Sequence, residues 1–164
     1  MGYEYNEYNS GRGGFLSSIP PVTKNIVAIN ILVFIATLIN ENFMVVNFAM
    51  FYPASPFFKP WQILTHMFMH GGFWHIFFNM YTLLMFGIIL ERALGSKKFL
   101  IFYFVTGLGA AALHTGVEWI QAQYFLSAGA AVNYHNLLMT PTLGASGAIY
   151  GVLIGYAMCY PDSR

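Results

Sequence analysis

Thr142-Leu143-Gly144-Ala145-Ser146-Gly147-Ala148-Ile149-Tyr150-Gly151 opens an apolar segment that continues to Tyr160. A serine flanked by small residues stands at the head of this segment, and glycines follow at four-residue spacing, at Gly147, Gly151 and Gly155. Small residues at this spacing allow membrane helices to approach each other closely. Ser146 is therefore either a packing residue or a nucleophile, and the rest of the chain has to distinguish these roles.

The composition is that of a membrane protein. The chain has 164 residues, of which 57% are hydrophobic and 8% charged, whereas a soluble domain carries about 25% charged residues. The net charge of +1 provides no basic field for nucleic acid. Cys159 is the single cysteine, so it has no partner for an internal disulfide. Nothing in the composition indicates a cofactor.

The apolar residues form four blocks, each long enough to enter or cross a bilayer. We therefore predict an all-α, polytopic membrane helix bundle with spanning helices at 22–39, 73–90, 99–115 and 146–160. Thr23 is a plausible N-cap for the first helix. Polar residues precede that helix, and residues 1–21 are predicted to form a disordered cytoplasmic tail.

Two long connections join these blocks. Residues 41–72 are rich in aromatic residues and contain Pro53, Pro56 and Pro60. This pattern favours a segment that lies in the membrane interface, because aromatic side chains collect there and proline interrupts helices. Residues 116–141 are too polar for a lipid-exposed span, so we expect them outside the bilayer, with a short amphipathic helix near 117–126.

The basic residues set the orientation. If the chain crosses the membrane four times, Lys59 lies on one side of the membrane. All the other basic residues lie on the opposite side, namely Arg12, Lys24, Arg92, Lys97, Lys98 and Arg164. The positive-inside rule then places both termini and the 91–98 turn in the cytoplasm. We expect an integral multi-pass protein, with a bacterial cytoplasmic membrane as the preferred location.

This threading brings three polar side chains to one leaflet. His75 and Asn79 lie four residues apart, on one face, near the outer end of the second helix. Ser146 begins the fourth helix at the same side, and polar residues inside a membrane are costly enough to suggest a function. The fourth helix, 146–160, is about 22 Å long, shorter than the hydrocarbon core of about 30 Å. We therefore expect residues 140–145 to enter the membrane as non-helical backbone, buried in protein or lining a water-filled cavity.

Three motifs, in order, resemble those of the rhomboid intramembrane serine proteases, over residues 22–164. They are His66-x3-His70-x4-His75-x3-Asn79, Glu91-Arg92-Ala93-Leu94-Gly95-Ser96, and Gly144-Ala145-Ser146-Gly147 followed by Tyr150. The resemblance implies that Ser146 is the nucleophile and that His75 and Asn79, with the Ser146 backbone N–H, stabilise the oxyanion. It implies supporting roles for Gly144 and Tyr150, the latter stacking against the catalytic histidine. Trp61 matches an aromatic position of the connecting loop, and Glu91 a structural acid of the turn.

The resemblance also implies six spanning helices, with the general base a histidine on the sixth. The five histidines of this chain are His66, His70, His75, His114 and His135, and none of them lies on a later helix. We therefore expect the membrane domain at 22–164 to be incomplete at its C-terminus and this polypeptide alone to be inactive. The glycine row is expected to receive the missing sixth helix, and His114 is the only internal substitute base.

Other interpretations remain open at this stage. His66, His70 and His75 could supply three zinc ligands, although no HExxH pattern is present; structural roles for His66 and His70, bonded to loop carbonyls, are favoured. A non-catalytic relative that binds transmembrane clients is a further alternative. For the protease, the implied substrates are single-span membrane proteins, cleaved near the outer face of the lipid bilayer; the sequence leaves the oligomeric state open.

Overall fold

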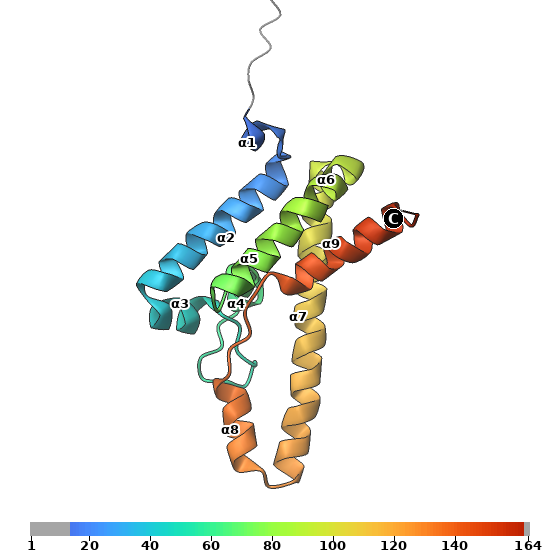
Figure 1. Ribbon diagram of the computed structural model, residues 1–164. Helices are drawn as coiled ribbons and strands as arrows, with labels where there is room; N and C mark the ends of the chain where they lie inside the picture. The colour runs from blue at the N-terminus through green and yellow to red at the C-terminus, as the bar shows by residue number, and fades with distance from the viewer. Residues whose placement is uncertain (1–13, 163–164) are drawn as a thin grey trace, which may run out of the picture.

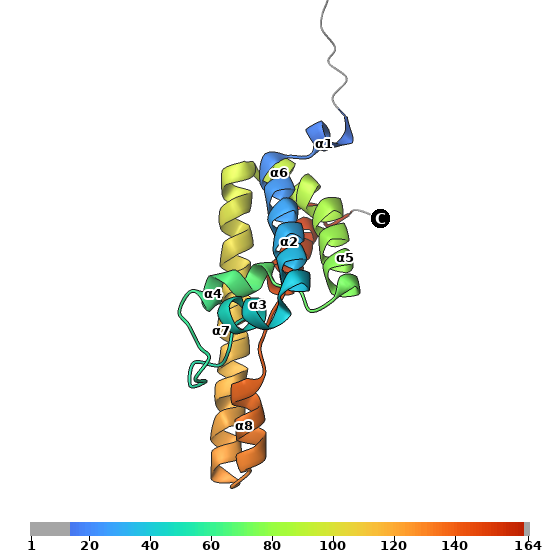
Figure 2. The same cartoon turned by 90° about the vertical axis from the view of Figure 1, so that its left-hand side faces the viewer.

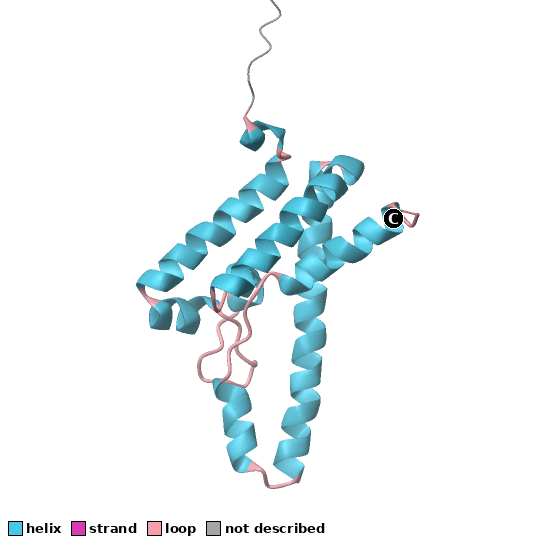
Figure 3. Ribbon diagram, in the orientation of Figure 1, coloured by secondary structure: helices cyan, strands magenta, loops and turns pink. Residues whose placement is uncertain are grey.

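The structure, a computed structural model, describes residues 14–162, in which helices joined by loops make up the fold (Figures 1 and 3). The elements, in chain order, are α1 (Phe15–Ser18), α2 (Pro21–Ile39), α3 (Glu41–Phe48), α4 (Gln62–Thr65), η1 (His66–Phe68), α5 (Phe73–Thr82), η2 (Leu83–Gly87), α6 (Ile88–Leu94), α7 (Ser96–Ser127), α8 (Ala131–Met139) and α9 (Ser146–Cys159). Within 14–162 the only β pairing is an isolated bridge between Met50 and Thr142.

The predicted membrane helix bundle is confirmed. Three helical stretches are long and apolar enough to cross a membrane, namely α2, the continuous run from α5 through η2 to α6, and α7. The fourth apolar helix, α9, has 14 residues and is shorter than a span. In Figure 1, α9 crosses α7 obliquely about midway along its length.

The third spanning helix is much longer than predicted. It was expected to end near residue 115, but α7 continues to Ser127 and has 32 residues, about 48 Å at 1.5 Å per residue. The amphipathic helix expected near 117–126 is its direct continuation, because no proline interrupts it and the turn comes only at Gly129, which has φ 65°. Helix α8 then returns alongside the C-terminal half of α7 (Figure 2).

The glycine row of α9 packs against α7, which corrects the expectation that it awaits a sixth helix. A Cβ on Gly147 would lie 2.5 Å from the Ala110 Cβ, and one on Gly155 would lie 2.9 Å from a ring carbon of Phe102. Gly151 faces Thr106 in the same way. Because glycine has no side chain, the two helices approach almost backbone to backbone.

Glu91 joins the start of the first spanning helix to the α6–α7 turn. Its carboxylate accepts hydrogen bonds from the backbone N–H groups of Val22 (3.0 Å) and Thr23 (2.7 Å). It also accepts from the hydroxyls of Thr23 and Ser96, both at 2.7 Å. The prediction that Thr23 caps the helix is wrong, since α2 begins at Pro21 and Glu91 satisfies its first free N–H groups instead.

The N-terminal tail is described only in part. Of the predicted tail 1–21, residues 1–13 lie outside the described residues, and Phe15–Ser18 form the short helix α1. The Arg92 guanidinium donates to the Ser18 carbonyl at 2.7 Å, so this part of the chain contacts the α6–α7 turn.

The connection between α2 and α5 folds around a buried glutamine. The Gln62 side chain accepts a hydrogen bond from Lys59 N (3.0 Å) and donates to the carbonyls of Val46 (3.0 Å) and Phe57 (3.1 Å). Trp61 is half exposed and donates its indole N–H to the Asn47 carbonyl at 2.8 Å. These hydrogen bonds satisfy backbone groups that would bond within a helix if the prolines of this connection did not interrupt it.

Candidate active site

Ser146 lies between an extended segment, residues 140–145, that backbone hydrogen bonds hold in place, and a helix. Residues 140–145 are non-helical, as predicted from the shortness of the fourth helix. Thr142 exchanges two backbone hydrogen bonds with Met50, at 2.9 and 2.7 Å, and the Gly144 N–H donates to the His66 carbonyl at 2.9 Å. Helix α9 then starts at Ser146. The Ser146 N–H is one of the first-turn groups that have no partner within the helix.

Gly144 is the point where His75 and Ser146 come together. Its φ of 128° lies in the region that favours glycine. A Cβ built on it would lie 2.9 Å from both the Cε1 and the Nε2 atom of His75, and 3.6 Å from the Ser146 Oγ. The imidazole of α5 and the hydroxyl of α9 therefore flank the same backbone position, 71 residues apart in sequence.

A groove of about 310 Å³ runs between α5 and α9. It is lined by His75, Phe78, Asn79, Thr82, Ser146, Ile149, Tyr150 and Leu153. Four residues singled out from the sequence thus share one groove. The ring of Tyr150 is mostly exposed, and it therefore offers a face to a further side chain.

Asn79 is held by His70, a pairing that sequence reasoning missed. The Asn79 amide nitrogen lies 3.0 Å from His70 Nε2, and both residues are buried. Burial, and secondarily His75, lowers the pKa of His70 to about 4, so the imidazole is neutral at pH 7 and its Nε2 accepts from the amide. His70 was expected to bond a loop carbonyl; only His66 does so, through Nδ1 to the Gln62 carbonyl at 2.9 Å.

A second cavity, of about 170 Å³, lies on the other side of Ser146. Its polar lining includes His66, His114 and Thr142, and α7 closes it through Gly107, Ala110 and Ala111. Ser146 therefore lines both the groove and this second cavity.

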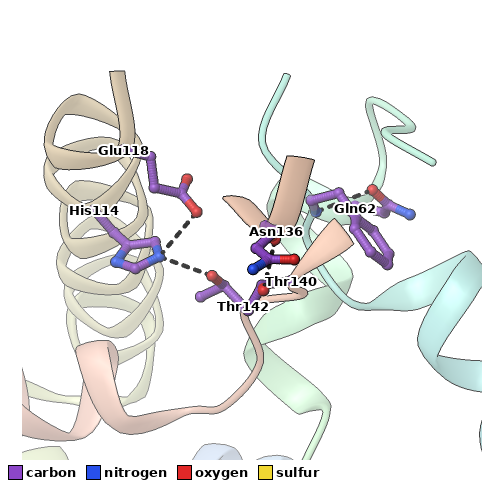
Figure 4. A network of polar contacts seen from close by, with 7 residues as sticks. Gln62, His114, Glu118, Asn136, Thr140 and Thr142 are labelled. Carbon is purple, nitrogen blue, oxygen red and sulfur yellow. Dashed lines mark hydrogen bonds and ion pairs between the residues drawn. The ribbon is translucent and has the colours of Figure 1, made fainter. Parts of the chain in front are cut away.

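His114 borders this cavity and belongs to a polar network above it. Its Nε2 lies 2.8 Å from the Thr142 Oγ1 and 3.4 Å from the Glu118 Oε1 (Figure 4). Helix α7 thus places His114 at the same end of the bundle as Ser146, as the threading predicted. No signal in the sequence places Glu118 beside the segment that leads to Ser146, because that position depends on the path of the extended residues 140–145.

The alternative zinc site is not assembled. Among residues 14–162, no group of three His, Cys, Asp or Glu side chains is close enough to hold a metal ion. His66 and His70 are instead engaged by Gln62 and Asn79.

Comparison with known proteins points to one family. The model of the rhomboid domain family matches residues 57–164. The chain is 33% identical over 95 residues to RHOMBOID-like protein 4 of Arabidopsis thaliana, covering 58% of this chain and 19% of that protein. It is 27% identical over 140 residues to Rhomboid-related protein 4 of Mus musculus, covering 85% and 41%. It is 33% identical over 92 residues to Rhomboid protease AarA of Providencia stuartii, covering 56% and 31%.

The chain thus spans no more than 41% of the length of these three relatives. The match nevertheless includes α5, α7 and α9, the helices that carry His75, Asn79, His114 and Ser146. Together with the helical membrane bundle and the ordered motifs, it shows that this chain belongs to the rhomboid family.

Proposed function

We propose that this chain is the nucleophile-bearing part of an intramembrane serine endopeptidase, which cleaves single-span membrane proteins near the outer membrane face. The observation that carries the proposal is the arrangement at Gly144, where His75 and the Ser146 hydroxyl flank one glycine of φ 128°. A serine hydroxyl at the start of a helix, beside an imidazole that can donate to a developing oxyanion and in a groove between membrane helices, suits nucleophilic attack on a peptide bond. The names of relatives such as Rhomboid protease AarA support the same reaction class.

Each residue has a defined role in this reaction. Ser146 Oγ attacks the peptide carbonyl, and the carbonyl oxygen becomes an oxyanion. The Ser146 backbone N–H, His75 and Asn79 donate to that oxyanion, and donors of this kind contribute about 10²–10³ in rate. The Asn79 amide has two hydrogens, so it can bond His70 with one and retain the other for the oxyanion.

The general base is proposed to come from a histidine outside these 164 residues. A serine hydroxyl is a weak nucleophile without an adjacent base, and the resemblance to the rhomboid proteases implies a histidine on a later helix for this role. The groove beside Tyr150 is open on the face that such a helix would cover. Loss of a base costs on the order of 10⁶ in turnover, so we expect this polypeptide alone to be essentially inactive.

Labelling with a serine-reactive phosphonate tests the proposal. In a longer form that includes the downstream helices, mass spectrometry is expected to find the adduct on Ser146, and Ser146→Ala should abolish it. Ser127→Ala is the matched control, because Ser127 is an exposed serine outside the groove, and it should not alter labelling. Absence of an adduct, with client binding retained, would favour the non-catalytic alternative.

The same assay on the 164-residue chain tests the missing base. We expect labelling to fall by orders of magnitude relative to the longer form. Strong labelling of the 164-residue chain would contradict this part of the proposal, and its loss in His114→Ala would identify His114 as an internal base.

A further inference from the structure

The hairpin of α7 and α8 carries an open, polar pocket that the proposed hydrolysis does not use. Its volume is about 510 Å³. Between the two helices it is lined by Glu118, Gln121, Phe125, Asn133, Asn136 and Leu137. It therefore combines one carboxylate, three amides and an apolar wall.

Glu118, which lines this pocket, has a carboxylate oxygen without a hydrogen-bond partner. The residue is only 8% exposed, and its Oε1 lies 3.4 Å from His114 Nε2. Its Oε2 is buried and has no hydrogen-bond partner. Among the residues that the structure describes, no lysine or arginine pairs with it. A buried carboxylate oxygen without a donor is costly, so the pocket is suited to a ligand that supplies one.

The pocket lies directly beside the candidate active site. Thr142 and His114 line both this pocket and the 170 Å³ cavity that contains Ser146. Figure 4 shows His114 between Glu118 and Thr142, with both contacts drawn.

The pocket also lies at the edge of the membrane. Glu118 is 22 residues beyond Ser96 along α7, which corresponds to about 33 Å of helix. A hydrocarbon core is about 30 Å thick, so Glu118 sits just past its end, on the side where α9 begins. A polypeptide cleaved at Ser146 would continue past this point as it leaves the bilayer.

We propose that the α7–α8 pocket binds a lysine or arginine side chain of the substrate segment that flanks the cleaved span. The cationic group donates to Glu118 Oε2 and to the amide oxygens of the pocket. Its aliphatic stem packs along Phe125 and Leu137. This inference rests on the proposed function for the identity of the ligand. The competing account is that Glu118 and His114 form only an i,i+4 pair that stabilises α7.

The test uses the whole chain with Ser146→Ala, in phosphatidylcholine nanodiscs, so that no hydrolysis interferes. The probe is a synthetic single-span peptide with one lysine in its outer flank and all other amines blocked; its twin carries norleucine at that position. A zero-length carbodiimide joins an amine to a carboxylate that it contacts, and mass spectrometry maps the linked residue. Glu41 is the internal control, because it is an exposed acid of α3 that lies outside the pocket.

We expect the lysine to be linked to Glu118 about 10-fold more than to Glu41. We also expect the lysine peptide to bind about 10-fold more tightly than its twin, as for one charge-assisted hydrogen bond. Glu118→Gln should remove that preference without changing the binding of the norleucine peptide. The comparisons of the two peptides, and of Glu118 with Glu41, need no variant and remain informative if Glu118→Gln unfolds the chain.

Two results would overturn the proposal. One is equal linkage at Glu118 and Glu41, or equal binding of the two peptides to the unmodified pocket. The other is loss of lysine linkage when phosphatidylethanolamine is added, since a lipid amine would then be the occupant. Neither result depends on whether Ser146 reacts with a phosphonate, so failure here and failure of the proposed protease chemistry are distinguishable.

Discussion

At the scale of single residues, the candidate site depends on one glycine. Gly144 combines a φ of 128° with a Cβ position that would lie 2.9 Å from His75 Nε2. Any side chain there meets both a backbone cost and a clash with the imidazole. The motif Gly144-Ala145-Ser146 can be recognised in the sequence, but the contact of His75 with Gly144 depends on how α5 packs beside the segment that leads into α9.

Gly144→Ala is expected to reduce phosphonate labelling of Ser146, in the longer form, by about 10-fold or more. Adopting positive φ costs an L-residue about 1–2 kcal/mol, and the added methyl group displaces His75 from Ser146. Gly95→Ala is the matched control, because Gly95 has φ 80° and nothing within 4 Å of its Cβ position. It should lower stability similarly and leave labelling unchanged; equal losses of labelling would refute a specific role for the His75 contact.

His70 makes stability depend on pH. Burial lowers its pKa from 6.5 to about 4, so the unfolded chain takes up a proton at a higher pH than the folded chain. The free energy of unfolding is therefore highest above pH 6.5. It decreases as the pH falls toward 4, by up to about 3 kcal/mol at about 1.4 kcal/mol per pKa unit. Unfolding in micelles between pH 7.5 and 4.5 should show this decline.

His70→Gln provides the control for this pH dependence. Glutamine retains a polar partner for Asn79 but does not titrate, so the decline should become shallower. His66 contributes in the same direction, because burial also lowers its pKa, and some dependence should persist. An unchanged slope in His70→Gln would assign the effect to other groups.

At the scale of secondary structure, the packing of α9 on α7 positions Ser146. Gly147, Gly151 and Gly155 bring α9 into contact with Ala110, Thr106 and Phe102. This close contact also leaves the opposite face of α9 exposed, at Tyr150, Ile154 and Met158. A further helix would therefore meet this second face rather than the glycine row.

Gly151→Val is expected to separate α9 from α7, because its side chain would overlap that of Thr106. Overpacking of this kind costs about 1–3 kcal/mol, and thermal unfolding in micelles measures it. Gly109→Val is the control, since a Cβ on Gly109 meets nothing within 4 Å. A similar loss of stability in both variants would show that helix propensity, and not the contact with α7, explains the effect.

At the scale of the whole molecule, the ends of the bundle are chemically distinct. At one end, Glu91 bonds the start of α2 and Arg92 bonds the Ser18 carbonyl. These hydrogen bonds hold both segments against the end of α6. Lys97 and Lys98 follow in the first turn of α7. The α7–α8 hairpin extends from the other end (Figure 1). There the polar residues Asn133, Asn136, Thr140 and Thr142 line a pocket together with His114 and Glu118.

This asymmetry predicts the orientation. In a Cys159→Ala background, Ser127→Cys should react with a membrane-impermeant maleimide added outside intact cells. Lys97→Cys should react only after permeabilisation, because the positive-inside rule places that turn in the cytoplasm. Both positions are exposed in the protein, so a reversed pattern would mean a reversed topology.

The sequence by itself determined the helical membrane bundle and the order of its four apolar helices, and it predicted the residues of the candidate site. These depend on local hydropathy, on helix length against bilayer thickness and on short motifs, all of which are properties of contiguous residues. Only the tertiary structure decided that the glycine row faces α7, that Asn79 is held by His70, and that Glu118 lies beside the segment leading to Ser146. Each of these contacts joins residues whose facing directions are set by the packing of separate helices, and no local pattern encodes that choice.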